Sequence, residues 1–240
     1  MIYNATRYTS GPVQGDPIHI IYGATVAKTY NQPGAFIGDD PWDIDWLDFE
    51  IYLDAIPQDM PTIFDVEHWP LNDGDQRVMH DSLAMYRACL KFIKTRRPDL
   101  PLGMFSAPPS HAQEVTSIAG WWHHEYARWE AKQIAARNLA HHLDWVTPSL
   151  YWKTTSASIA AKYATAILSE CARFRAWGKK ICPFIMPRPI DGGATAPFLW
   201  GPGFNDWLNQ SVRPYTDGVI VWDYAQHNGE WPIELTAMLA

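Results

Sequence analysis

The sequence predicts an α/β fold, and within that class a single TIM-like (β/α) barrel. Apolar runs of strand length alternate with segments of helical periodicity along most of the 240 residues, and this alternation is typical of parallel βαβ units. The apolar runs are nearly continuous, as in strands that are buried on both faces. No linker, low-complexity tract or internal repeat is visible, so we expect one catalytic domain over residues 1–240.

The expected barrel includes distorted forms and forms with fewer than eight βα units. The alternative is a doubly wound open sheet. It is less favoured because no glycine-rich phosphate loop follows the first predicted strand.

The expected elements follow one another in order. Strands are predicted at 18–25, 62–67, 100–109, 144–152, 179–188 and 217–225, and helices at 42–56, 76–97, 121–143, 156–177 and 202–212, with a helical stub near the C-terminal end. The helix at 76–97 has apolar residues near helical spacing, basic residues in its last turn and Pro98 just beyond it. Gly178 ends the helix at 156–177.

Composition excludes several classes of partner. The net charge is −7 and no long basic run occurs, so we expect neither nucleic acid nor an anionic membrane surface as a partner. No apolar stretch reaches the roughly 18 residues of a spanning helix, and the first residues do not have the pattern of a signal peptide. The sequence does not indicate an oligomeric state.

No cofactor and no metal are expected. Cys89, Cys171 and Cys182 are scattered without metal-ligand spacing and are interpreted as buried free thiols. His123 and His124 would lie on different faces of one helix, and with the pair at 141–142 they are interpreted as surface or capping residues.

Tryptophan is unusually abundant, at 13 residues. Many tryptophans belong to ordinary cores, but flat indole rings also stack on the C–H faces of sugars. Composition alone leaves a packed core and an aromatic ligand cleft as equal alternatives.

In a barrel, chemistry is carried at the C-terminal ends of the strands. Acids and aromatics gather there in this sequence. The residues expected to line the substrate cleft are Trp69, Phe105, Trp152, Arg188, Trp222, Asp223 and Tyr224. Lys153 and Arg188 are interpreted either as groups that recognise an anionic substrate or as solvated charges.

The strand predicted at 62–67 ends in Asp65 and Glu67, which are two residues apart. On a strand such residues point to the same side, roughly 6–7 Å apart. Two carboxylates so close disfavour each other's ionisation, which raises the pKa of one of them. A carboxyl group that remains protonated to a higher pH can act as a general acid. Two ordinary solvated acids at a strand end are the alternative.

Five segments in order resemble the hyaluronidases, which are β-barrel hydrolases of N-acetylhexosaminides. "FDVEHWP" resembles D-W-E-x-W-R-P of that family and "LGMFSAPP" resembles G-F-Y-x-x-P. "VTPSLYWK" is similar to L-Y-P-S-I-Y, "ICPFIMPRPID" to P-V-x-x-Y-V, and "DGVIVWDYA" to G-x-V-I-W-G-S. The resemblance covers residues 62–225.

The resemblance implies a substrate-assisted mechanism, in which the acetamido oxygen of the substrate attacks the anomeric carbon. It implies Glu67 as the general acid/base and Asp65 as the partner of the acetamido group. Tyr151 matches a tyrosine that hydrogen-bonds around the cyclic intermediate. Trp222 matches the tryptophan that lines the site of the −1 sugar, and Trp69 matches the tryptophan that follows D-x-E.

The sequence also departs from the family. The chain is shorter and lacks the disulfide framework, Phe105 replaces a tyrosine, and Pro70 stands where an arginine follows the tryptophan. The net charge does not favour a polyanion such as hyaluronan. The expected function is a retaining glycosidase of an N-acetylhexosamine polysaccharide. The alternatives are a non-catalytic carbohydrate-binding barrel and a muramidase of the GH25 type. An extracellular or cell-wall substrate without a signal peptide would suit a phage-borne enzyme.

Overall fold

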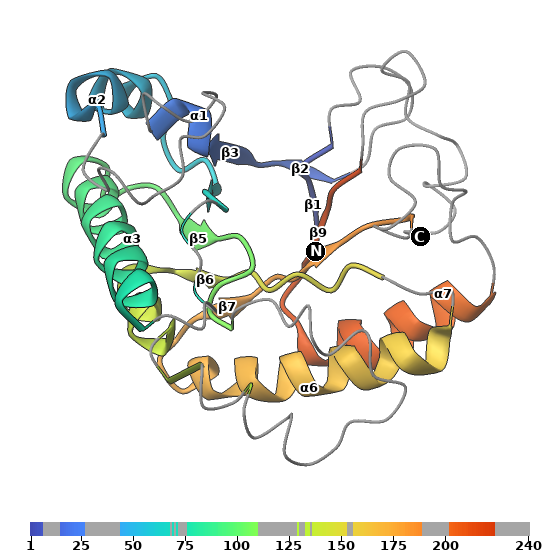
Figure 1. The fold of residues 1–240 in the computed structure, drawn as a ribbon. Coiled ribbons are helices and arrows are strands. Elements are labelled where there is room, and N and C mark those ends of the chain that lie inside the picture. The colour runs from blue at the N-terminus through green and yellow to red at the C-terminus, as the bar shows by residue number, and fades with distance from the viewer. Residues whose placement is uncertain are drawn as a thin grey trace.

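A computed structural model describes residues 1–6, 15–26, 44–67, 69, 71, 76–109, 129, 133–134, 136–152, 156–188 and 202–223. Its strands are β1 Ile2–Asn4, β2 Asp16–Pro17, β3 His19–Tyr22, β4 Thr62–Asp65, β5 Leu102–Met104, β6 Trp145–Val146, β7 Lys180–Ile181, β8 Phe184–Ile185 and β9 Val219–Val221. Its α-helices are α1 Gly23–Val26, α2 Trp46–Asp54, α3 Gln76–Arg96, α6 Ala157–Arg175 and α7 Pro202–Trp207 (Figure 1).

Every strand pair in the described residues is parallel. The strands form three small sheets, in the orders β2-β1-β9-β8, β3-β4-β5 and β6-β7. Single bridges, Phe105 to Thr147 and Ser149 to Phe184, connect β5 with β6 and β6 with β8. The predicted parallel α/β class is therefore confirmed. The ladders are short and interrupted, so the described residues do not form a closed barrel.

Most predicted elements are present, with shorter strands. The strand predicted at 179–188 is divided into β7 and β8 by Cys182 and Pro183, because proline has no N–H to donate to a ladder. The three-residue β1 was not predicted, although it pairs with both β2 and β9. The described end of the helix predicted at 121–143 is a 3-10 turn, Asn138–His142. The predicted C-terminal stub lies outside the described residues.

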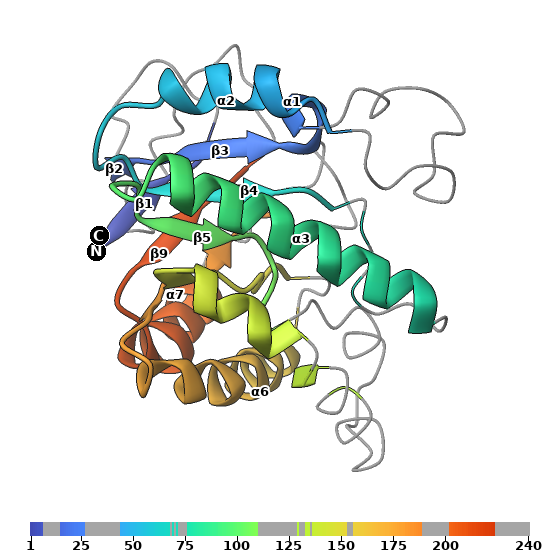
Figure 2. The same ribbon diagram turned by 90° about the vertical axis from the view of Figure 1, so that its left-hand side faces the viewer.

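The strands divide their side chains between an interior and an outer layer. Ile63 belongs to an interior cluster with residues of β1, β6, β8 and β9, whereas its neighbour Phe64 packs toward the helices. α2 and α3 cover one side of the strands, and α6 and α7 cover another (Figure 2). A Cβ at Gly103 would lie 2.7 Å from Ile63 Cδ1 and 3.0 Å from Thr147 Cγ2, so any other residue there would displace these side chains.

Polar clamps hold the N-terminal ends of the strands. The carboxylate of Asp144 accepts from the Leu102 N–H and from Lys94 Nζ, both at 2.9 Å. Asp217 repeats the arrangement by accepting from the Ile181 N–H at 2.8 Å. Asp144 precedes β6 and binds the backbone of β5, and Asp217 precedes β9 and binds the backbone of β7. Neighbouring βα units are therefore fixed at the end where the strands begin.

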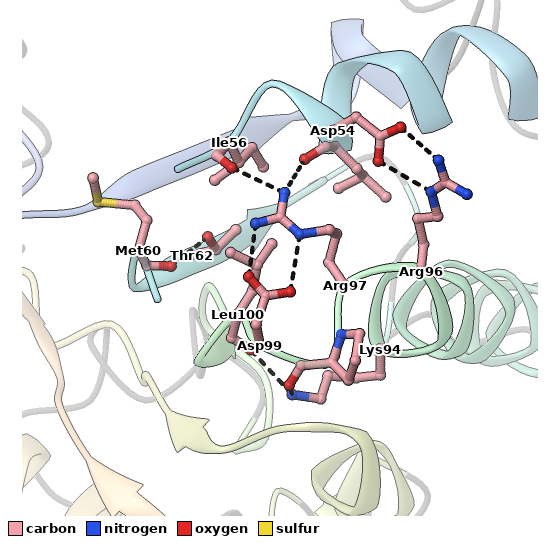
Figure 3. A network of polar contacts seen from close by, with 11 residues as sticks. Asp54, Ile56, Met60, Thr62, Lys94, Arg96, Arg97, Asp99 and Leu100 are labelled. Atoms are coloured by element: carbon pink, nitrogen blue, oxygen red, sulfur yellow. Dashed lines mark hydrogen bonds and ion pairs between the residues drawn. The ribbon is translucent and has the colours of Figure 1, made fainter. Parts of the chain in front are cut away.

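Arg97 adds a second clamp at the same end (Figure 3). Its Nη1 donates to the carbonyl oxygens of Leu53 at 2.5 Å and Ile56 at 2.9 Å. Its other guanidinium nitrogens pair with Asp99. The end of α2 is thus joined to the loop that leads into β5. None of the described helices is long and apolar enough to cross a membrane.

Candidate active site

The C-terminal ends of the parallel strands bring the predicted acids and three of the predicted aromatics to one edge of the fold. Asp65 is the last residue of β4 and alternates with the interior residue Ile63. Phe105, Tyr151 and Trp222 follow β5, β6 and β9, and all three belong to the interior cluster. These residues therefore lie at the same end of the parallel strands, which is the end where the strand-end argument expects a site.

Asp65 is half-buried, and its Oδ1 is buried without a hydrogen-bond partner in the described structure. Burial, together with the charge of Glu67, raises the pKa of Asp65 to about 7. Glu67 is more exposed, yet its pKa is also raised by removal of water. The charge of Glu67 therefore raises the pKa of Asp65 as expected, although burial is the larger cause of the increase. The pair keeps one proton available near neutral pH.

Three aromatic rings form a continuous wall beside this edge. The ring centroid of Tyr151 lies 5.9 Å from that of Phe105 and 5.8 Å from that of Trp222, and the Trp222 ring is nearly parallel to it, at 24°. Phe184 meets Phe105 edge-on from below. Tyr151 is buried and Trp222 is partly exposed. Of the three predicted tryptophans, Trp222 has the most surface to offer a ligand.

The other two predicted tryptophans are buried. Trp152 is 4% exposed and packs against Phe204 and Trp207 in the layer beneath α6 and α7. Trp69 is 5% exposed and packs edge-on against Tyr86. Both indoles therefore contribute to packing around the site in this structure, and neither presents a face to solvent.

Arg188 and Asp223 lie at the ends of β8 and β9 and bind each other. The Arg188 Nε–H is shared between the two carboxylate oxygens of Asp223, at 3.0 and 3.1 Å, and both side chains are buried. Their opposite charges therefore compensate each other within the fold. Tyr224 and Lys153 lie outside the described residues.

Two further residues lie at this edge, Tyr22 and Ser106, and neither was predicted as a catalytic or substrate-binding residue. Tyr22, the last residue of β3, is the register partner of Asp65. Its signal was available, since it lies within the strand predicted at 18–25. Ser106 has a φ of 54°, and its buried Oγ lacks a hydrogen-bond partner in the described structure. Such left-handed backbone at a non-glycine residue is costly and gathers at functional sites, but a serine gives no sequence signal for it.

In the described part of the chain, no three His, Cys, Asp or Glu side chains come together as metal ligands would. Cys89, Cys171 and Cys182 are free and buried there. His123 and His124 lie outside the described residues.

Searches for similar sequences found no match to a family model and no match to a curated protein. The structure is similar to bee venom hyaluronidase in complex with a hyaluronic acid tetramer, at 18% identity and a TM-score of 0.59. That match covers 88% of this chain and 79% of the hyaluronidase. A second, monoclinic structure of the enzyme matches at 16% identity and a TM-score of 0.57.

The structure is also similar to an endo-β-1,4-mannanase of glycoside hydrolase family 26 from Cellulomonas fimi, at 13% identity and a TM-score of 0.51. That match covers 81% of this chain and 45% of the mannanase. Both kinds of neighbour are TIM-barrel glycosidases. The fold is TIM-barrel-like. At these identities the likeness establishes the fold, and a fold of this kind serves many chemistries.

Proposed function

We propose that this protein is a retaining glycoside hydrolase that cleaves a polysaccharide containing N-acetylhexosamine. In this proposal Glu67 is the general acid/base, Asp65 binds the substrate's 2-acetamido group, and the acetamido oxygen is the nucleophile. The observation that carries the proposal is the pair of acids at and just beyond the end of β4, the half-buried Asp65 and the more exposed Glu67, with their raised pKa values. The hyaluronidase-like fold supports it.

The two acids differ in the way that the proposed roles require. Glu67 is exposed enough to reach a glycosidic oxygen, and its raised pKa keeps a fraction of the carboxyl group protonated for donation. The buried Oδ1 of Asp65 has no partner in the described structure. Burying an acceptor without a partner is unfavourable, so an amide N–H of the substrate would relieve that cost as it binds.

The ion pair between Arg188 and Asp223 supports a nucleophile supplied by the substrate. A conventional retaining glycosidase needs a second carboxylate that faces the acid across the scissile bond. Asp223 was the other candidate at the strand ends, and its carboxylate is held by a buried guanidinium. Tyr151 and Trp222 then form the wall of the −1 sugar, with Tyr151 held between Trp222 and Phe105.

The substrate is proposed only by class. The net charge of −7 favours a neutral glycan over a polyanion. We therefore propose chitin-type oligomers as substrates in preference to hyaluronan. An extracellular or cell-wall polymer is the proposed setting. Phe105, which lacks the hydroxyl of the family's tyrosine, supports the second candidate, a carbohydrate-binding barrel without turnover.

Release of reducing ends from a glycan panel tests the proposal. The panel contains chitin oligomers, hyaluronan, peptidoglycan and a mannan that lacks acetamido groups. We expect cleavage of an acetamido glycan, and a loss of about 10²-fold or more in Glu67→Gln with an unchanged circular dichroism spectrum. Binding without cleavage by the wild type would favour the carbohydrate-binding barrel. Cleavage by Glu67→Gln within a few-fold of wild type would remove Glu67 from the proposed role.

A further inference from the structure

We infer that Tyr86 of α3 is a positioning residue whose hydroxyl holds the acid segment, residues 65–67, in the geometry that couples Asp65 to Glu67. The catalytic consequence of this inference rests on the proposed function. The structural part does not, because it concerns two carboxyl groups that can be observed without any substrate.

The Tyr86 hydroxyl contacts the backbone on both sides of Glu67. It donates a hydrogen bond to the carbonyl oxygen of Val66, the residue between the two acids. The backbone N–H of Trp69 donates to the same phenol oxygen. Tyr86 is only 3% exposed, so water does not replace these bonds easily. One hydroxyl therefore joins α3 to the acid segment and to the residue that follows it by two positions.

The ring of Tyr86 is held separately from its hydroxyl. It meets Trp69 edge-on at 5.1 Å and 76°, and Phe64 edge-on at 6.3 Å and 86°. Contacts of this kind stabilise an aromatic cluster without any polar atom. A phenylalanine at position 86 can keep both contacts, so the role of the hydroxyl can be tested apart from the packing.

The surroundings of Tyr86 keep its phenol protonated, so the hydroxyl can donate a hydrogen bond. Burial raises the pKa of the Tyr86 phenol, and the nearby charges of Asp65 and Glu67 and the thiol of Cys89 raise it further. The phenol therefore remains protonated, and its hydrogen is directed to the Val66 carbonyl. Its role is to fix a backbone carbonyl and not to transfer a proton.

Loss of the hydroxyl acts on both acids. The Val66 carbonyl belongs to the peptide bond that joins Val66 to Glu67, so a rotation of that unit changes how the Glu67 side chain faces Asp65. Without the phenol, the Val66 carbonyl and the Trp69 N–H lose a buried partner, which is unfavourable unless the segment moves to find another. Such a movement weakens the coupling between the carboxyl groups.

The test is a carbon-13 NMR titration of the Asp and Glu carboxyl groups in Tyr86→Phe. Because the charge of Glu67 helps to raise the pKa of Asp65, we expect the Asp65 pKa to fall by about half a unit or more in this variant. The matched control is Tyr52→Phe. It also removes a partly buried hydroxyl, which contacts His19 Nε2 at 2.7 Å at the start of β3 and bonds to Thr25 of α1, but which makes no contact with the acid segment in the described structure. This control should titrate as the wild type does.

Kinetics supplies a second readout. If the glycan panel reveals activity, Tyr86→Phe should lower kcat about 10-fold or more while KM changes less, since a small misplacement of a catalytic group costs rate before binding. If the wild type is inactive but the Asp65 pKa is lower in Tyr86→Phe than in the wild type, the result would support the positioning role and count against the proposed function. An unchanged Asp65 titration in Tyr86→Phe would overturn the inference, whatever the activity.

Two further variants keep the test decisive if Tyr86→Phe does not fold. Replacement of Tyr86 by 4-aminophenylalanine keeps a donor at the same place and should preserve the wild-type titration. Replacement by 4-methylphenylalanine fills the same space without a donor and should lower the Asp65 pKa. Equal titrations in these two variants would show that the donor has no positioning role.

Discussion

The Nε–H of Arg188 lies between the two carboxylate oxygens of Asp223, at 3.0 and 3.1 Å, and both side chains are buried. This pair fastens the end of β8 to the end of β9, immediately beside Trp222. A charge left unpaired in such a place is strongly unfavourable, because the protein interior does not solvate it.

Asp223→Ala should therefore lower stability while the folded fraction keeps most of its activity. Removing one partner of a buried ion pair typically costs about 3–5 kcal/mol of unfolding free energy, which urea denaturation measures. The matched control is Asp54→Ala, which breaks the exposed pair with Arg96 and should cost far less. A stable but inactive Asp223→Ala would instead identify Asp223 as a catalytic acid.

Trp222 and Trp177 provide a contrast between two exposed indoles. Trp222 lies at the mouth against Tyr151, whereas Trp177 is 45% exposed and stacks on His141 at the opposite ends of the strands. Trp222→Ala should weaken oligosaccharide binding and turnover, because a sugar then loses the apolar face on which it stacks. Trp177→Ala should leave both unchanged. Fluorescence titration measures the binding, and equal effects of the two changes would exclude Trp222 from the cleft.

Much of the architecture could be predicted from the sequence because apolar periodicity reports burial directly. The 21-residue α3 was predicted to within one residue at its C-terminal end, where basic residues precede Pro98. The strands were predicted too long, because an apolar run continues beyond the residues that form a regular ladder, as at Cys182 and Pro183 between β7 and β8. The three-residue β1 is too short to show a period, and only its pairing with β9 identifies it.

The sequence did not predict which aromatic side chains of the candidate site are buried in the core and which lie at the cleft. Asp65 was placed correctly at a strand end, since the strand and its alternation could be read. Trp152 and Trp222 look alike in sequence, yet one packs under α6 and the other lies beside the mouth. Tyr86 was predicted only as an apolar position of a helix. Its hydrogen bond to Val66 depends on how α3 packs on β4, and no spacing within the chain encodes that contact.

The raised pKa of Asp65 predicts how stability depends on pH. The folded protein holds the Asp65 proton up to about pH 7, whereas the unfolded chain releases it near pH 4. Between these values the native state binds more protons, so the unfolding free energy falls as the pH rises. Asp65→Asn should remove this fall, so its stability relative to wild type should increase as the pH rises from about 4 to about 7.

Asp99→Asn is the control for that experiment. The guanidinium of Arg97 beside Asp99 lowers the pKa of that carboxyl group. Its stabilising contribution is therefore present at neutral pH and is lost as the pH falls through the folded pKa. Thermal unfolding at several pH values compares the two variants. A parallel pH dependence in wild type and Asp65→Asn would show that Asp65 is not protonated in the native state near neutral pH.

The last prediction separates a nucleophile supplied by the substrate from one supplied by the enzyme. Asp65 and Glu67 project from one strand end, and Asp223 is held by Arg188. If the acetamido oxygen attacks, cleavage should retain the anomeric configuration, and glycans without a 2-acetamido group should not be cleaved. A thiazoline that mimics the cyclic intermediate should inhibit strongly, since a site complementary to the transition state binds its mimics tightly.

Asp65→Asn should lose much of the rate by the same mechanism, because the amide nitrogen of the substrate is no longer held by a carboxylate. Proton NMR of the fresh product reads the configuration. Inversion, or efficient cleavage of mannan, would reject this mechanism and direct attention to a carboxylate elsewhere in the chain.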